Sequence, residues 1–114
     1  MTRIIVCGGR EFSDQAAVDG ALDAVHKLKK ITVLVHGAAR GADSLAVDWA
    51  KRNGIKEEPH PYPGDKGKAG GPIRNQKMAD AGADGLVVFP GGRGTADMEM
   101  RAKLAGIPTW RPYK

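Results

Sequence analysis

The sequence lacks several features that would assign it to a class at once. Its 114 residues include one cysteine, Cys7, which excludes a disulfide framework and a cysteine-rich zinc site. The three histidines, His26, His36 and His60, share no short ligand spacing, so we predict no metal site, and no motif requires a cofactor. No apolar run approaches the ~18 residues that span a bilayer, and the N-terminal run is too short for a signal peptide. We therefore expect a soluble cytoplasmic protein with no membrane partner.

Aromatic residues are also scarce, at 5% of the chain, which argues against a platform that stacks the bases of a single strand. Lysine and arginine total 18 against 13 aspartate and glutamate, giving a net charge of +5. This charge favours an anionic partner, whether a nucleotide, a nucleic acid or an acidic surface, without choosing among them. The hydrophobic share of 41% is typical of a globular protein, and the length predicts a single domain over residues 1–114.

Short apolar runs alternate with amphipathic stretches along the whole chain. We predict strands at 3–7, 31–35, 55–62, 84–89 and 107–110, and helices at 13–30, 42–53, 72–81 and from Thr95 to Gly106. Because the strands are apolar on both faces, they indicate a sheet covered on both sides. The predicted fold is α/β, a three-layer Rossmann-like domain with a mostly parallel sheet of about five strands and helices on both faces. Three prolines near residues 55–62 place that strand at a sheet edge.

Glycine-rich turns follow three of the predicted strands, at residues 8–9, 37–41 and 91–94. The carboxyl ends of parallel strands meet at one edge of a sheet, so we expect the three turns to lie along one rim. Ligands bind at this rim in open α/β sheets.

The turn Pro90–Thr95 carries the strongest local signal. Its glycines let the backbone approach a ligand, and a helix opening at Gly94 and Thr95 would offer unpaired amides to a phosphate. The Thr95 hydroxyl would cap this helix or contact the phosphate. The alternative is a tight strand-to-helix turn with a capping threonine and no ligand. The spacing matches neither a Walker loop nor the dinucleotide fingerprint. The candidate ligand-binding residues of this turn are Gly91, Gly92, Arg93, Gly94 and Thr95.

A second run of small residues, from Gly37 to Asp43, opens another predicted helix. Arg40 adds positive charge there, and Asp43 is placed to accept hydrogen bonds from a ribose or a base. In the alternative interpretation, Asp43 only favours the dipole in the first turn of its helix. The candidate ligand-binding residues of this turn are Gly37, Ala38, Arg40, Gly41 and Asp43.

Two further arginines stand near predicted turns. Arg10 follows the first glycine pair, and Arg74 precedes Asn75 near the start of a helix. A guanidinium binds phosphate bidentately, although a solvated surface arginine is the alternative for both positions. These segments add Gly8, Gly9, Arg10, Arg74 and Asn75 to the candidate ligand-binding residues.

Taken together and in this order, the motifs resemble the SLOG superfamily and, within it, the YspA/cpYpsA-related group. The blocks that carry the resemblance are Gly8–Arg10, Gly37–Asp43, Ala69–Met78 and Pro90–Thr95. The resemblance implies a Rossmann-like nucleotide-binding domain of bacterial or phage origin and, by analogy, a homodimer. Relatives of the group include the LOG phosphoribohydrolases and the Rossmann-like domain of DprA.

LOG enzymes carry the pattern Pro-Gly-Gly-x-Gly-Thr-x-x-Glu and an upstream arginine, and the resemblance implies that Arg74 matches this catalytic arginine. The position of the glutamate holds Met98, which has no carboxylate to assist glycoside cleavage. Asp97 and Glu99 flank it, each about 100° away around a helix. We therefore predict binding of a nucleotide-derived small molecule, such as a nucleotide or an NAD-derived metabolite, in a sensor-like role.

Two alternatives remain from different classes of protein. One is a LOG-like phosphoribohydrolase that cleaves the N-glycosidic bond of nucleoside monophosphates, using Arg74 with Asp97 or Glu99. The other is DprA-like binding of single-stranded DNA, which the net charge favours and the scarcity of aromatic residues disfavours.

Overall fold

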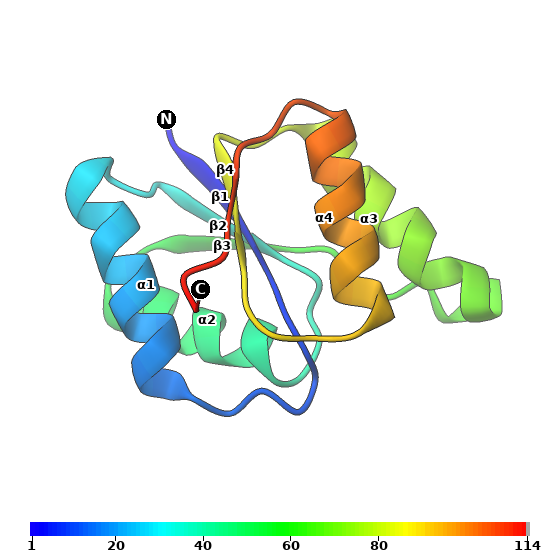
Figure 1. The fold of residues 1–114 in the computed structure, drawn as a ribbon, viewed down its shortest axis with the longest axis horizontal. Helices are drawn as coiled ribbons and strands as arrows, with labels where there is room; N and C mark the ends of the chain where they lie inside the picture. Colours follow the sequence, from blue (N-terminus) through cyan, green and yellow to red (C-terminus); the bar gives the residue numbers. More distant parts are fainter. Residues whose placement is uncertain (114) are drawn as a thin grey trace.

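The computed structural model describes residues 1–113, apart from the side chain of Lys66, and strands and helices alternate along them (Figure 1). The elements are β1 (Arg3–Cys7), α1 (Gln15–Leu28), β2 (Val33–His36), α2 (Ala42–Arg52), β3 (Lys56–Pro59), the 3-10 helix η1 (Gly64–Ala69), α3 (Gly70–Ala81), β4 (Gly85–Val88), α4 (Arg93–Leu104) and β5 (Thr109–Trp110).

The strands form one sheet in the order β3-β2-β1-β4-β5, and every neighbouring pair is parallel. Helices α1 and α2 cover one face, and α3 and α4 cover the other (Figure 1). This arrangement confirms the predicted three-layer Rossmann-like fold, and β3 lies at an edge as its prolines indicate. Among the described residues, no helix is both long and apolar enough to cross a membrane.

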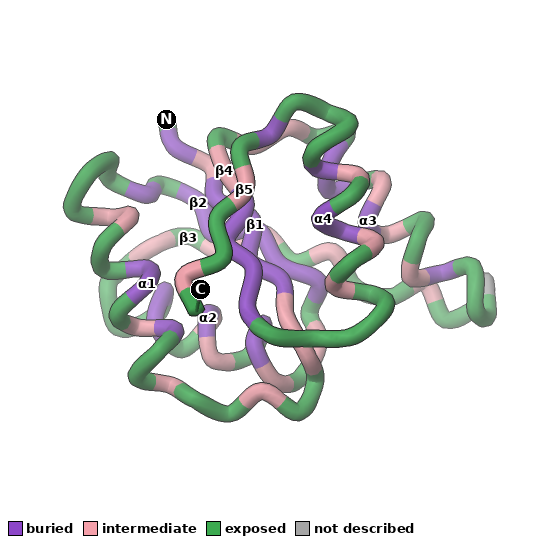
Figure 2. The backbone as a smooth tube through the Cα atoms, in the orientation of Figure 1, coloured by how far each residue is buried: buried purple, intermediate pink, exposed green. Residues whose placement is uncertain are grey.

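Alternate residues of the central strand point into two separate cores. Ile4 and Val6 pack with side chains of α1 and α2, whereas Ile5 and Cys7 pack with side chains of α3 and α4. Figure 2 shows the buried class concentrated along these strands. Trp49 anchors the first core, where it is 1% exposed and its Nε1 donates to Asp23 at 2.8 Å. Burial of a large apolar side chain stabilises a fold by roughly 1.5–3 kcal/mol. Since β1 contributes side chains to both cores, it is packed on both faces.

Helix α4 differs from its prediction at both ends. It begins at Arg93 with Gly92 as N-cap, and no side chain caps it, so the first of the two roles predicted for Thr95, capping this helix, was wrong. Its last helical residue is Leu104, and Ala105 is the exposed C-cap residue. Glu99 is buried on this helix, and its carboxylate accepts from Arg111 Nη2 at 2.6 Å. The buried carboxylate is therefore paired with an arginine twelve residues further along the chain.

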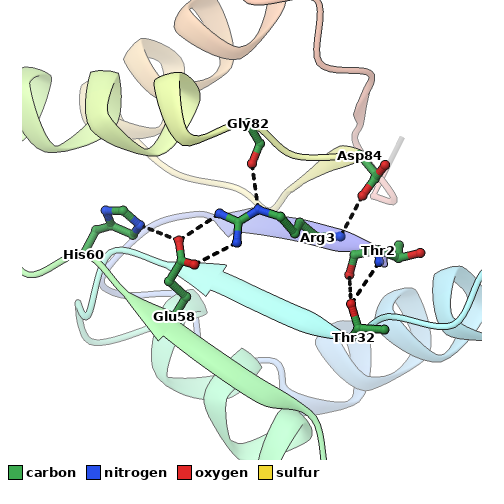
Figure 3. A network of polar contacts seen from close by, with 7 residues as sticks. All are labelled: Thr2, Arg3, Thr32, Glu58, His60, Gly82 and Asp84. Carbon is green, nitrogen blue, oxygen red and sulfur yellow. Dashed lines mark hydrogen bonds and ion pairs between the residues drawn. The ribbon is translucent and has the colours of Figure 1, made fainter.

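A polar network fastens the edge strand β3 to the start of β1 (Figure 3). Both Nη atoms of Arg3 donate to Glu58, at 2.7 and 2.8 Å, and its Nε donates to the carbonyl of Gly82 at 3.0 Å. His60 Nε2 lies 2.9 Å from the same carboxylate. The hydrogen bonds from Arg3, followed by those from His60, lower the pKa of Glu58 to about 2.

Candidate functional site

The three glycine-rich turns meet at the carboxyl ends of β1, β2 and β4. The amide of Gly9 donates to the carbonyl of Pro90 at 2.8 Å, and the amide of Ala42 donates to the carbonyl of Gly9 at 3.1 Å. Contact is so close that a Cβ on Gly8 would stand 2.6 Å from the Cβ of Ala42. The turn after β1 is thus held between the other two.

A cavity of about 630 Å³ opens beside these turns and is closed on its far side by α3 and the segment before it. This volume is in the range of about 300–1,000 Å³ that small-molecule sites occupy. The predicted site residues that line it are Gly8, Gly9, Arg10, Gly37, Asp43, Arg74, Asn75, Gly92, Arg93, Gly94 and Thr95.

A smaller cavity of about 240 Å³ adjoins the first and shares Arg10, Gly37 and Arg74 with it. It is lined by two more predicted residues, Ala38 and Arg40. Arg40 is exposed and donates to Glu11 at 2.7 Å, so its charge is already partnered.

Two predicted site residues, Gly41 and Gly91, line neither cavity. Gly41 has a φ of +78°, and a Cβ there would strike the carbonyl of Gly9 and stand 2.6 Å from the carbonyl carbon of Arg10. A Cβ on Gly91 would strike the hydroxyl of Thr95. Both glycines let the turns pack together, and their neighbours present groups to the cavity.

The N-terminus of α4 faces the larger cavity without a cap. Gly92 precedes the helix, and no side chain bonds to its first turn. The amides of Arg93, Gly94 and Thr95 have no intrahelical acceptor, because an α-helix leaves its first amides unpaired. All three residues line the cavity, so the positive end of the helix dipole is directed at it. Such an end favours an anion.

The arginines of the chain divide into two groups. Five of the eight form an ion pair with a carboxylate, namely Arg3, Arg40, Arg52, Arg101 and Arg111. The other three, Arg10, Arg74 and Arg93, pair with no carboxylate of residues 1–113, and all three line the larger cavity. Lys68 lines it too. The cavity therefore gathers the uncompensated guanidinium groups of the described chain.

Arg74 is fixed in place although it has no carboxylate partner. Its Nη1 donates to the carbonyl of Gly37 at 2.7 Å, and its Nε donates to Asn75 Oδ1 at 2.9 Å. The side chain thus reaches from α3 to the turn after β2, where a Cβ on Gly37 would strike it. Neutral acceptors orient the guanidinium and leave its charge available to a ligand.

Asp43 is buried at the start of α2, with 6% exposure. Its Oδ2 accepts from the amide of Gly37 at 2.9 Å and from that of Ala39 at 3.3 Å. Burial raises the pKa of the Asp43 carboxyl, and the two amide hydrogen bonds only partly oppose this. Burial likewise raises the pKa of the Cys7 thiol, which lines the same cavity and stays neutral rather than becoming a nucleophile.

Of the two acidic neighbours of Met98, Asp97 lines the larger cavity and Glu99 does not. Met98 lines the cavity with 1% exposure, and Asp97 lines it as well. Asp97 Oδ2 accepts from Asn75 at 3.0 Å and from Arg101 at 2.8 Å. Burial alone would raise the pKa of Asp97, but these two hydrogen bonds outweigh it and leave the pKa lowered. Glu99 does not line the cavity, and its hydrogen bonds with Arg111 lower its pKa.

Several residues of the larger cavity were not predicted, and Tyr62 is the most informative of them. It lines both cavities, its hydroxyl donates to the carbonyl of Gly67, and its ring packs against Gly70. Tyr62 comes shortly after β3, so the rule that ligands bind beyond the carboxyl ends of strands would have included it. The other unpredicted lining residues are Val6, Cys7, Ala39, Lys68, Gly71, Pro72 and Met78.

The fold is shared with a solved bacterial structure. DNA processing protein A (DprA) from Streptococcus pneumoniae superposes with a TM-score of 0.77 and 22% sequence identity. The match covers 96% of this chain and 49% of the DprA chain, so the present chain spans about half of that protein.

Sequence comparison gives a closer relationship. The gene 61 protein of Mycobacterium phage D29 is 38% identical over 117 residues, which cover 95% of this chain and 94% of the phage protein. The model of the YspA, cpYpsA-related SLOG family matches residues 2–62, which hold two of the glycine-rich turns. The chain therefore belongs to the YspA, cpYpsA-related SLOG family.

Proposed function

We propose that this protein binds a nucleotide-derived small molecule, such as a nucleotide or an NAD-derived metabolite, in the cavity at the carboxyl rim of its sheet. The observation that carries the proposal is the gathering of the three unpaired arginines, Arg10, Arg74 and Arg93, around this one cavity. Unpaired cations are costly to place together unless an anion joins them. A phosphate-bearing ligand supplies that anion.

The phosphate is assigned to the N-terminus of α4. Its amides at Arg93, Gly94 and Thr95 are uncapped, and Gly92 adds no side chain that would keep a ligand away. Arg74 is already oriented by Gly37 and brings a charged donor to the same space. The rest of a nucleotide would occupy the region next to Asp43 and extend toward Tyr62, which lines both cavities.

Binding without catalysis accounts best for the residues in the cavity. Met98 occupies the position where the LOG pattern has its glutamate, and Glu99 is turned to Arg111. The enzyme alternative keeps one favourable observation, because Asp97 does reach the cavity. That carboxylate is held by Arg101 and Asn75, which lower its pKa and make it a poor proton donor to a departing base.

Steric blockade of the cavity tests the binding proposal. A Cβ on Gly92 would meet nothing within 4 Å, so the first side-chain atom of Gly92→Phe fits without a clash and its ring extends from a residue that lines the cavity. Calorimetric titration of AMP, GMP, CMP, UMP and NAD⁺ should detect binding to the native chain and none to this variant. Gly20→Phe is the matched control, since Gly20 is exposed on α1 and equally open. Unchanged affinity of Gly92→Phe would refute the site.

The enzyme alternative is tested directly by chemistry. Incubation of the native protein with AMP or GMP, followed by chromatography for free base, should detect no release. Release that disappears in Asp97→Asn would establish a phosphoribohydrolase and overturn the binding-only role.

The expected homodimer stays a prediction, and we propose α4 as its contact surface. Met100 and Leu104 leave apolar side chains exposed on α4, at 45% and 81% exposure. Sedimentation of the native chain beside Leu104→Glu tests whether this helix forms the dimer contact.

A further inference from the structure

The proposed nucleotide site contains one carboxylate, Asp43, that forms no ion pair within the described residues, although the charge of Arg74 acts on it from nearby. Asp43 lines the cavity, yet no arginine or lysine of the described residues forms an ion pair with it. Its position is fixed, because its Oδ2 accepts from the amides of Gly37 and Ala39 at 2.9 and 3.3 Å. Both hydrogen bonds that the Asp43 carboxylate accepts from the described residues therefore go to Oδ2.

The other oxygen of Asp43, Oδ1, accepts no hydrogen bond from residues 1–113. Every fully buried side-chain oxygen or nitrogen of these residues has a hydrogen-bond partner. Because Oδ1 has none, it is not fully buried. The residue is 6% exposed, and it lines the larger cavity. Its remaining accessible surface therefore opens to the space in which the ligand is proposed to bind.

An acceptor oxygen in a cavity for anions restricts the chemistry of the ligand. A carboxylate repels a phosphate, and losing water from Oδ1 without a new donor is unfavourable. The ligand must then bring hydrogen-bond donors together with its negative charge. A ribose phosphate combines both, because its sugar hydroxyls donate while its phosphate binds elsewhere.

We propose that Asp43 Oδ1 accepts a hydrogen bond from a ribose hydroxyl, so that the site prefers ribonucleotides to nucleotides that lack this hydroxyl. The inference rests on the proposed function and adds the class of sugar to it. Asp43 is then a specificity residue and not merely a brace for the turn after β2. The two roles use different oxygens, which makes them separable by substitution.

The separating variant is Asp43→Asn. The amide oxygen of asparagine can still accept from Gly37 and Ala39, which preserves the brace, whereas its NH₂ group replaces the acceptor Oδ1 with a donor. Calorimetry on the full chain should show AMP binding at least about tenfold more tightly than 2′-deoxy-AMP or 3′-deoxy-AMP, as expected for a hydrogen bond to a charged group. In Asp43→Asn the preference should fall to about onefold, with the thermal unfolding midpoint little changed.

Two ligand comparisons show which sugar hydroxyl is the donor, and one variant tests whether the effect is specific to Asp43. Ribose 5-phosphate should keep an advantage over 2-deoxyribose 5-phosphate if the 2′-hydroxyl is the donor, and 3′-deoxy-AMP reports the other hydroxyl. Asp48→Asn makes the same change of side chain on α2 outside both cavities and should keep the preference for ribose.

The outcomes separate the two proposals. Equal binding of AMP and both deoxy forms to the native chain overturns the sugar assignment and leaves the proposed function standing. A preference that survives Asp43→Asn, or that is lost equally in Asp48→Asn, overturns the role of Asp43. Failure of AMP, GMP, CMP and UMP to bind at all overturns the proposed function, and the sugar assignment falls with it.

Discussion

The N-termini of α1 and α4 each follow the carboxyl end of a strand, yet they are finished in opposite ways. Asp14 caps α1, accepting from the amide of Ala17 at 3.0 Å. Gly92 precedes α4, and no side chain serves the first turn of that helix. A helix end that satisfies its own amides gains stability, whereas an open end keeps them for a ligand. The cap residue thus distinguishes an end that supports the fold from one that is suited to function.

The arginines repeat this distinction. Arg3 is paired with Glu58 and links two strands. Arg74 is oriented by carbonyl and amide oxygens, so no carboxylate neutralises its charge. The same side chain is structural where a carboxylate meets it and available where none does.

The largest effect is expected when α4 receives the cap that α1 already has. In Gly92→Asp the new carboxylate would accept from the first-turn amides and repel the phosphate. Nucleotide affinity measured by calorimetry should fall about a hundredfold or more, as expected for losing charge-assisted hydrogen bonds. The free energy of unfolding should stay level or rise by a few tenths of a kcal/mol.

Gly92→Asn separates the two causes of that loss, because asparagine caps the helix without a negative charge. Its affinity should lie between those of the native chain and Gly92→Asp. Native affinity in both variants would show that α4 does not hold the phosphate.

The next effect compares an unpaired arginine with a paired one. Arg74→Met removes a guanidinium that faces the cavity, so affinity should fall about tenfold to a hundredfold. Arg52→Met removes one that is bonded to Asp19 and Asp48 outside the cavity and should leave affinity unchanged. Equal losses in the two variants would mean that net charge alone governs binding.

A smaller effect concerns stability only. Asp14→Ala removes the cap of α1 and should lower the free energy of unfolding by about 1 kcal/mol in urea titrations. Nucleotide affinity should not change, since neither Asp14 nor Ala17 lines a cavity at the rim. A loss of binding in this variant would show that the N-terminus of α1 also contributes to ligand binding, contrary to the comparison of the two helices.

The smallest effect is an acid-dependent one at the paired arginine (Figure 3). The folded-state pKa of Glu58 is about 2, against 4.5 for the free group, so its contribution is complete above pH 4.5 and is lost as pH falls toward 2. Glu58→Gln should therefore cost at most about 1 kcal/mol near neutral pH and flatten this part of the stability profile. An unaltered profile between pH 4.5 and 2 would show that this pair adds nothing.

Most of the architecture could be predicted from the sequence, because β1, β2 and β4 are largely apolar runs that end in turn residues. The run Arg3–Cys7 has the predicted bounds, and the edge position of β3 follows from its prolines. The glycines after β1, β2 and β4 also indicated one rim, since parallel strands align their carboxyl ends. The family resemblance is confirmed by the sequence comparisons.

The details that failed depend on contacts distant in sequence. Thr95 is a favoured cap residue by type, but the helix already starts after Gly92, and the Thr95 hydroxyl packs against Gly91. The burial of Glu99 depends on Arg111, and no helical periodicity reveals such a partner. Local patterns predict which residues form turns, whereas the pairing of charges decides which of them remain available.

The central claim is that the uncapped end of α4 binds the ligand's phosphate. Amide chemical-shift changes during titration of ¹⁵N-labelled protein with AMP test it most directly. We expect the largest shift changes at the amides of Arg93, Gly94 and Thr95 and almost none at those of Gln15 and Ala17, at the capped end of α1. Saturable shift changes at the α1 amides, or binding without shift changes at the α4 amides, would contradict this claim.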